Sequence, residues 1–229
     1  EKYHDQHMGG RVFELAWTHR QVVLAQSNLT EADAQLYLRL ASSVVYTNPL
    51  RRASASMLAR NRRGQSGLWG YGISGDRPIV LLRIGANGNG EMVRQIVRAH
   101  SYWRMMGLEV DLVICHDDDT GYQQVLQDQI STIIANNNAA ALNNVPGGIF
   151  VRRLDMIAEE DRILLQTVAR VVLTGTGGDF AEQVNKRSRT IAPMPPHVPR
   201  LAADRVTSGP PLATSPPGLF PNGIGEFSV

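Results

Sequence analysis

The sequence predicts an α/β protein in which a helical N-terminal lead-in precedes a four-stranded parallel sheet flanked by helices, with a proline-rich C-terminal extension. Short apolar runs alternate with segments of helical periodicity from Pro78 onward, and strands joined through helices form parallel sheets. Upstream of this region the apolar spacing is helical, and downstream of about residue 190 prolines replace any periodicity. We therefore expect three parts: a lead-in over residues 1–67, an α/β domain over 68–185 with a boundary stretch at 68–77, and a linker with the start of a further domain over 186–229.

Two helices are predicted in the lead-in. Apolar residues recur at helical spacing over residues 10–27, and Asn28 and Leu29 then interrupt the pattern. Thr30, followed three residues later by Asp33, has the pattern of a capping box that starts a second helix. That helix ends before Pro49, because the residue preceding a proline is disfavoured in a helix.

Five arginines lie among small and apolar residues between positions 51 and 63. Such a cluster can form an anion-binding face or a solvated helix face. We expect the solvated helix face, because a run of charges usually lies in solvent.

The α/β domain is expected to contain four strands and three connecting helices. The strands are short apolar runs bounded by proline, glycine or polar residues, and the helices show i, i+3, i+4 apolar spacing. The expected strands are residues 78–84, 109–115, 149–153 and 170–174, and the expected helices are residues 91–106, 122–136 and 157–169.

Composition excludes several classes of protein. A hydrophobic content of 43% in 229 residues supports a globular core, and a net charge of +2 is too small to indicate nucleic-acid binding. The single cysteine, Cys115, excludes an internal disulfide framework, and its place at a strand end is typical of a core residue. No apolar run reaches the about 18–20 residues that a membrane-spanning helix needs.

Gly70, Gly72 and Gly75 match the G-x-G-x-x-G pattern of dinucleotide-binding proteins. In those proteins the glycines follow a strand and open a helix, so that a phosphate meets the helix N-terminus. Here the glycines precede the predicted strand, so we interpret them as a tightly packed turn rather than a phosphate site. We expect Asp76 to cap this turn or to pair with an arginine.

Ligands of open parallel sheets usually bind beyond the carboxyl ends of the strands. Here those ends carry the run His116, Asp117, Asp118 and Asp119, and the pair Arg152 and Arg153. A histidine and carboxylates after a strand are a ligand set for a divalent metal, as in metal-dependent sugar-nucleotide transferases. Alternatively, one aspartate caps the next helix and the others are solvated. No second carboxylate cluster follows another strand, which favours the capping interpretation.

Residues 68–84 resemble the "G-I-S-G-D-x-P-I-V-L" segment of bacterial cyclic β-1,2-glucan synthases, with Arg77 where leucine is expected. Residues 220–227 are similar to the "F-F-N-G-L-G-G-F" opening of a β-sandwich in that family, with Glu226 where the pattern has glycine. Five further segments resemble the family in the same order along the chain: residues 13–18, 58–62, 98–104, 147–153 and 160–162.

The resemblance implies a fragment of a larger enzyme at the cytoplasmic side of the bacterial inner membrane. Such synthases combine a glycosyltransferase region, which uses UDP-glucose and a divalent metal, with a C-terminal part similar to family 94 glycoside phosphorylases. The resemblance places this chain in that C-terminal part, between two β-sandwich-like segments and before the helical barrel that holds the general-acid aspartate. It therefore assigns neither a catalytic residue nor a cofactor to these 229 residues.

Three hypotheses follow. In the first, the chain is a non-catalytic module that packs against neighbouring domains of the same polypeptide through Trp69, Tyr71 and Asp76, and that contacts β-1,2-glucan. In the second, it is a metal-dependent transferase domain that binds a sugar nucleotide at the acidic loop 116–121. In the third, it is a regulatory domain that binds phosphate or a nucleotide at the glycine loops 85–90 or 175–178.

Overall fold

The computed structural model describes residues 6–85, 90–117, 123–137 and 139–186, together with the pairs 220–221 and 226–227. The chain divides into two compact units, residues 1–188 and residues 189–229. In the second unit, β5 (Phe220–Pro221) pairs antiparallel with β6 (Glu226–Phe227). The predicted acidic-loop residues Asp118 and Asp119 lie outside the described residues.

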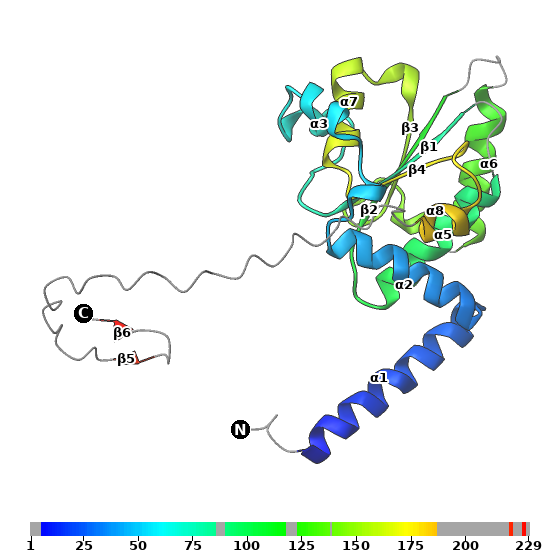
Figure 1. Cartoon of the computed structure of the whole chain (residues 1–229). Coiled ribbons are helices and arrows are strands. Elements are labelled where there is room, and N and C mark those ends of the chain that lie inside the picture. The colour runs from blue at the N-terminus through cyan, green and yellow to red at the C-terminus, as the bar shows by residue number, and fades with distance from the viewer. Residues whose placement is uncertain are drawn as a thin grey trace, which may run out of the picture. The chain divides into compact units, whose positions relative to one another are not determined.

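A four-stranded parallel sheet forms the centre of the first unit (Figure 1). Its strands are β1 (Ile79–Ile84), β2 (Asp111–His116), β3 (Ile149–Arg153) and β4 (Val171–Thr174). Their spatial order is β3-β2-β1-β4, and every neighbouring pair is parallel. The predicted α/β class is confirmed, and the structure adds the strand order.

Helices cover both faces of the sheet. The connections α5 (Gly90–Met105) and α6 (Gln123–Asn136) lead from β1 to β2 and from β2 to β3, and they pack on one face. The connection from β3 to β4 crosses back over β2 and β1 through α7 (Glu159–Val168), which packs on the other face. Connections between parallel strands are right-handed. A connection that runs across the sheet in the opposite direction, as the one from β3 to β4 does, therefore places its helix on the opposite face.

Alternation along each strand divides the core into two layers. Val80, Leu82 and Ile84 of β1 pack toward α5, whereas Ile79 and Leu81 pack toward α7. Because both faces are covered, the strands are nearly continuous apolar runs, which is why the sequence places all four of them correctly.

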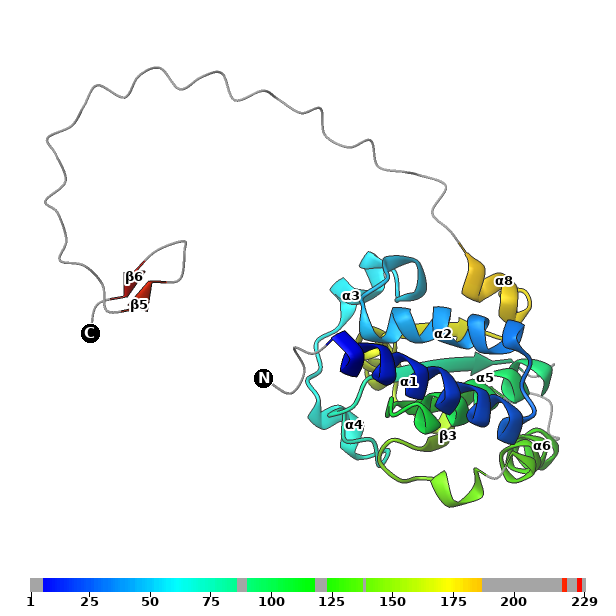
Figure 2. The ribbon, with the colours of Figure 1, turned by 90° about the horizontal axis from the view of Figure 1, so that it is seen from below.

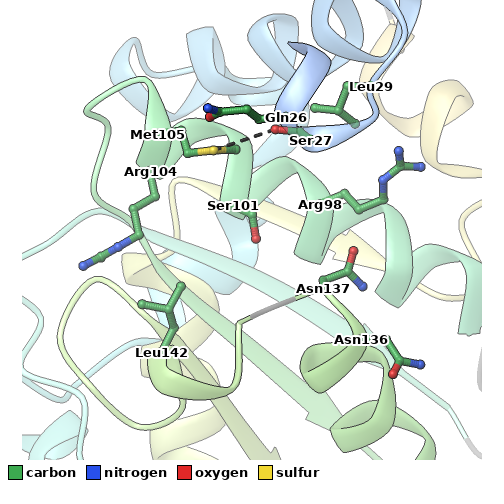
Figure 3. A pocket seen from close by; sticks show the side chains of 10 residues that line it. All are labelled: Gln26, Ser27, Leu29, Arg98, Ser101, Arg104, Met105, Asn136, Asn137 and Leu142. Carbon is green, nitrogen blue, oxygen red and sulfur yellow. Dashed lines mark hydrogen bonds between the residues drawn. The ribbon is translucent and has the colours of Figure 1, made fainter. Parts of the chain in front are cut away.

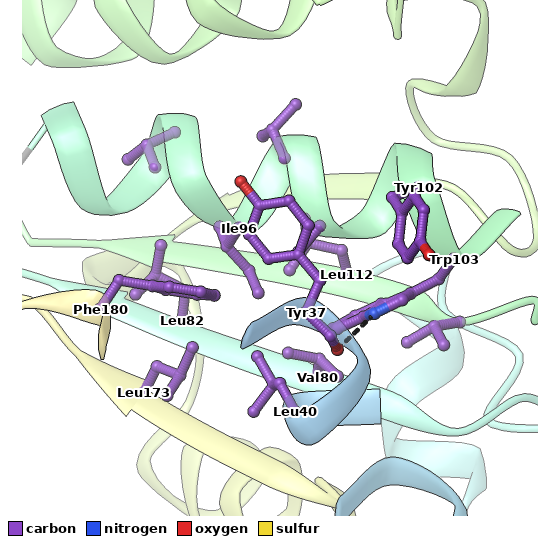
Figure 4. Packing of buried hydrophobic residues seen from close by; sticks show 14 of the residues in the cluster. Tyr37, Leu40, Val80, Leu82, Ile96, Tyr102, Trp103, Leu112, Leu173 and Phe180 are labelled. Carbon is purple, nitrogen blue, oxygen red and sulfur yellow. Dashed lines mark hydrogen bonds between the residues drawn. The ribbon is translucent and has the colours of Figure 1, made fainter. Parts of the chain in front are cut away.

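The lead-in is part of the first unit. It contains α1 (Gln6–Ser27) and α2 (Glu31–Val45), and Thr30 and Asp33 form the predicted capping box with reciprocal bonds of 3.1 Å. From α2, Tyr37 and Leu40 enter the core that α5 covers, as Figure 4 shows. The Trp103 Nε1 of α5 donates to the Tyr37 carbonyl at 2.9 Å. Figure 1 shows α1 extending away from the sheet toward its N-terminal end.

The arginine cluster between residues 51 and 63 is used for internal contacts. It spans the 3₁₀ helix η1 (Pro49–Arg51) and α3 (Ala55–Arg60). Arg51 is buried and donates to the Ser43 hydroxyl at 3.2 Å and to the Val184 carbonyl, and Arg52 donates to the Thr167 carbonyl at 2.9 Å. The expected solvated face is therefore wrong for these two residues, because buried backbone carbonyls recruit their guanidinium groups.

Shorter elements complete the unit. The helix α8 (Phe180–Asn185) begins with a capping box formed by Asp179 and Glu182, and it lies beside α2 and α5 in Figure 2. The remaining elements are α4 (Ser66–Trp69), η2 (Ala140–Leu142) and η3 (Leu154–Met156). In the part of the chain that the structure describes, no helix has the length and apolarity needed to cross a membrane.

Acid will destabilise the first unit through His100, which is buried in α5. Burial lowers the pKa of this imidazole below its ordinary value of 6.5, because the protein interior disfavours the charged form. The unfolded chain therefore binds the proton more tightly than the folded chain. The stability linked to His100 is complete above about pH 6.5 and is lost as the pH falls toward the folded-state pKa, by up to about 1.4 kcal/mol per pH unit.

Urea denaturation of the parent chain and of His100→Gln over a pH series measures this effect. Glutamine places an amide donor near the position of His100 Nε2, which lies 2.9 Å from the Val110 carbonyl, but it does not titrate. We expect the difference in unfolding free energy between the two chains to shrink as the pH falls from about 7.5 to about 5. A difference that stays constant over this range would contradict the assignment.

Candidate functional site

The reversal in strand order lies between β1 and β4, and it opens a cavity at their carboxyl ends. This cavity of about 220 Å³ is lined by Arg83, Asp117, Thr174 and the backbone at Gly85 and Gly175. Crevices at the carboxyl ends of the strands, where the strand order reverses, are the usual ligand sites of open α/β sheets. In this chain the loops after β1 and β4 lead to α5 and α8, which pack on the same face of the sheet.

A second cavity of about 200 Å³ continues from the first under α7. Arg83 and Asp117 line both cavities, and Glu159, Arg162 and Gln166 of α7 close the second one. The Arg83 Nη1 donates to Gln166 Oε1 at 3.2 Å. The lining thus has mixed charge, with arginines and carboxylates facing one another.

Cys115 lies at the floor of this region, in register between Arg83 of β1 and Arg152 of β3. Burial raises the pKa of its thiol to about 12, and the nearby arginines offset this only in part. A thiol with so high a pKa is not a nucleophile near neutral pH. The interpretation of Cys115 as a core residue therefore has structural support.

His116 and Asp117 lie on opposite faces of the sheet. His116 continues the side of β2 that carries Ile114, and it is buried toward α5. Asp117 follows the alternation toward α7, and its backbone N–H donates to the Ile84 carbonyl at 2.9 Å. Within the described ranges no three His, Cys, Asp or Glu side chains converge as a metal-ligand set. A site at the acidic loop would need Asp118 and Asp119, which lie outside those ranges.

The side chains of Arg152 and Arg153 also have different partners. The Nε and Nη2 of Arg152 donate to the Tyr71 carbonyl at 2.9 and 2.6 Å, and its Nη1 donates to Asn144 Oδ1 at 2.7 Å. Arg153 forms an ion pair with Asp155 at the surface. Arg152 thus anchors the glycine-rich stretch to the edge strand β3.

The stretch of residues 68–76 is held at several points. The Tyr71 hydroxyl donates to Asp161 Oδ2 of α7 at 2.9 Å, and Asp76 Oδ1 accepts from Gln65 Nε2 at 3.0 Å. Gln65, rather than an arginine, is therefore the hydrogen-bond partner of Asp76. Trp69 is a 63% exposed residue, and its Nε1 donates to the Ser74 carbonyl at 3.3 Å. Of the three residues predicted to contact a neighbouring domain, Trp69 and Asp76 are exposed and Tyr71 is half-buried.

Gly75 should be far less tolerant of substitution than Gly70. Gly75 has a φ of +77°, and a Cβ there would lie 3.0 Å from atoms of Gln65 and Leu68. Gly70 has a φ of −59° and open space around a built Cβ. We expect Gly75→Ala to lower the unfolding free energy by about 1–2 kcal/mol or more, and Gly70→Ala to change it by less than about 1 kcal/mol.

Urea denaturation of both variants checks this expectation. Equal effects of the two substitutions would show that the left-handed conformation at Gly75 is not required.

A larger cavity was not predicted from the sequence. It has a volume of about 460 Å³ and lies where α5 meets the ends of α1 and α6. Its residues come from three helices that are far apart in the sequence, so no local pattern marks it. The asparagine run at 136–138 is the sequence feature nearest to it.

Comparison with known proteins finds a protein that is similar over most of this chain. No protein-family model matches the chain. It is 31% identical over 170 residues to the cyclic β-(1,2)-glucan synthase NdvB of Rhizobium meliloti (strain 1021). The match covers 74% of this chain but 6% of that protein, so the chain spans a small part of its relative's length. The predicted resemblance is therefore confirmed: the chain is related to the cyclic β-1,2-glucan synthases and is similar to a small segment of one of them.

Proposed function

We propose that this chain is a non-catalytic module of a membrane-associated cyclic β-1,2-glucan synthase that positions neighbouring domains of the same polypeptide. The synthase is a glycosyltransferase at the cytoplasmic side of the bacterial inner membrane, and its UDP-glucose and divalent metal belong to another region. The relationship to NdvB supports a role in glucan synthesis.

The observation that carries this proposal is the arrangement of Trp69. The residue is 63% exposed, yet its Nε1 donates a hydrogen bond to the Ser74 carbonyl. The stretch beneath it is fixed by Arg152 and by the bond from Tyr71 to Asp161. An aromatic side chain that is exposed and already ordered loses little entropy on binding, which is typical of the anchor of an interface.

The contacts of the neighbouring polar residues agree with a structural role. Tyr71 and Arg152 bond within the module, and Arg153 pairs with Asp155. Of these groups, Tyr71 and Arg152 orient the stretch that carries Trp69.

A second candidate is a metal-dependent transferase that binds a sugar nucleotide at loop 116–121. The cavity of about 220 Å³ favours it, because Asp117 lines that cavity at the reversal of strand order. A carboxylate at this point is suited to a divalent cation that bridges a diphosphate.

Calorimetry with UDP-glucose and Mn²⁺ separates the two candidates. We expect the intact chain to give no binding heat and no transfer of glucose. Asp117→Ala and Asp119→Ala are the informative variants, and Asp128→Ala on the exposed side of α6 is the matched control. Heat that disappears in the first two variants and persists in the control would establish the transferase and overturn the non-catalytic module.

A further inference from the structure

The helix α1 is covered mainly near its C-terminal end. Val23 and Leu24 are buried in the core that α5 also covers. The Ser27 hydroxyl donates to the Met105 sulfur of α5 at 3.7 Å, as Figure 3 shows. Toward its N-terminus the helix extends away from the sheet (Figure 1), and Phe13 is 78% exposed. Within the part of the chain that the structure describes, most of α1 is therefore uncovered.

Two stripes of mainly apolar residues run along α1. Steps of four and three residues return to the same side of a helix, because one turn takes about 3.6 residues. Arg11, Glu14, Thr18 and Gln21 follow such steps and make up a polar side. The first stripe consists of Met8, Val12, Leu15, His19 and Val22, and the second stripe consists of Phe13, Trp17, Arg20, Leu24 and Ser27.

The second stripe continues a contact that the structure already contains. Trp17 and Phe13 lie seven and eleven residues before Leu24, so all three side chains leave the helix on the same side. Leu24 is buried, whereas Phe13 and Trp17 are exposed. The N-terminal half of this stripe is thus the continuation of a packed surface.

The first stripe is exposed at its aliphatic residues. Val12, Leu15 and Val22 are between 47% and 61% exposed. Together the two stripes occupy more than half of the helix circumference, whereas a helix that packs on one neighbour needs an apolar stripe of about 100°. The pattern of α1 is therefore that of a helix that lies between two neighbours.

The uncovered apolar surface is large for a soluble domain. An aromatic side chain buries about 150–250 Å², so Phe13 and Trp17 alone leave on the order of 300 Å² uncovered. The aliphatic residues of the first stripe add to this area. Contiguous apolar patches of more than a few hundred Å² mark sites of interaction.

Charge favours a protein partner over a membrane surface. Helices that lie in a membrane surface are rich in Lys and Arg on their polar face. The polar side of α1 carries Arg11 and Glu14, whose charges offset each other, and Arg20 is paired with Glu31 of α2. Such a helix has little attraction for anionic lipids.

A second copy of this chain fits the surface less well. Two copies of α1 that pair with each other cover one stripe on each helix and leave the other stripe in water. Two neighbouring helices instead form a groove, into which the side-chain ridges of a third helix pack. A groove lined by two helices covers both stripes at once.

We propose that α1 docks into an apolar groove between two helices, which contact Val12 and Leu15 on one side and Phe13 and Trp17 on the other. That the groove belongs to another part of the same polypeptide rests on the proposed function. The relative is much longer than its matching segment, which is 6% of it, so its length can accommodate such a partner. This docking surface is separate from Trp69, which lies on α4.

Photocrosslinking in a chimeric synthase tests the proposal. This chain replaces the matching segment of the Rhizobium meliloti enzyme, and a photoreactive phenylalanine analogue stands at position 13, 15 or 21. We expect positions 13 and 15 to crosslink to two different peptides of the synthase outside these 229 residues. Position 21, on the polar side of α1, is the matched control and should give several-fold less product.

The identity of the crosslinked partner decides the outcome. Crosslinks to a second, differently tagged copy, crosslinks to lipid, or crosslinks from one stripe alone would each overturn the two-sided groove. Equal crosslinking from position 21 would overturn it as well, and so would the absence of crosslinks in a chimera that makes glucan.

The isolated 229-residue chain gives a test that does not depend on the chimera. It should sediment as a monomer at about 10 µM, and it should not bind vesicles of phosphatidylglycerol and phosphatidylethanolamine. Phe13→Ser and Leu15→Ser should leave its unfolding midpoint nearly unchanged, because both residues are exposed. A dimer or vesicle binding that either substitution abolishes, or a large loss of stability in either variant, would contradict the proposal.

Failure of this proposal is distinguishable from failure of the proposed function. Binding of UDP-glucose and Mn²⁺ by the isolated chain contradicts the non-catalytic module and leaves the crosslinks from α1 unchanged. A chimera whose glucan yield depends on Trp69, but whose α1 gives no crosslinks, contradicts the docking of α1 alone.

Discussion

Replacing Trp103 with alanine will lower the free energy of unfolding by about 3–5 kcal/mol. The side chain is 1% exposed and packs between α5 and α2 in the core that Figure 4 shows. Its Nε1 donates to the Tyr37 carbonyl at 2.9 Å, so truncation also leaves a buried acceptor without its donor. The effect is large because Trp103 of α5 connects α2 of the lead-in to the core that covers the sheet.

Urea denaturation followed by circular dichroism measures this loss. Trp17→Ala is the matched control, because that tryptophan is 65% exposed on α1 and should cost less than about 1 kcal/mol. Domains are stable by only about 5–15 kcal/mol, so Trp103→Phe is the milder variant to measure where Trp103→Ala does not fold. Similar losses at positions 17 and 103 would contradict the described packing.

Replacing Arg152 with alanine will destabilise the domain by about 1.5–3 kcal/mol and will loosen the stretch that carries Trp69. Two of its nitrogen atoms donate to the Tyr71 carbonyl, and its guanidinium carbon lies 5.4 Å from the centre of the Phe150 ring. Charged donors give stronger hydrogen bonds than neutral ones, and the substitution leaves the carbonyl without them. Hydrogen exchange at residues 68–76 should accelerate with the loss of stability.

Arg153→Ala is the control for this prediction. That side chain pairs with Asp155 at the surface, and exposed ion pairs contribute about 0–1 kcal/mol. A loss at Arg153 as large as that at Arg152, or unchanged exchange in residues 68–76 of Arg152→Ala, would show that Arg152 does not anchor the stretch.

The strands and the capping box could be predicted from the sequence because each depends on a local pattern of residues. The strands are apolar runs because both faces of the sheet are covered, and the capping box at Thr30 and Asp33 depends on residues three apart. The strand order was not predicted, because it depends on the side of the sheet to which α7 crosses. The helix α8 was missed because its six residues bury only Phe180 and Val184, although Asp179 and Glu182 carry a capping pattern.

The site was harder to predict than the fold, because it depends on which face each side chain occupies. His116 and Asp117 are adjacent in the sequence, yet alternation sends them to opposite faces. Arg152 and Arg153 separate in the same way, one to Tyr71 and the other to Asp155. The prediction of a solvated face was wrong at Arg51, because one of its acceptors is the Val184 carbonyl, which lies 133 residues away in the sequence.

The most direct test of the proposed module is glucan synthesis by a chimeric enzyme. The matching segment of the Rhizobium meliloti synthase is replaced by this chain, and cyclic β-1,2-glucan is measured in cells that lack the native enzyme. We predict that the chimera makes glucan and that Trp69→Ala reduces the yield about tenfold while the isolated variant domain stays folded. An undiminished yield from Trp69→Ala, or from an enzyme without the segment, would contradict the proposal.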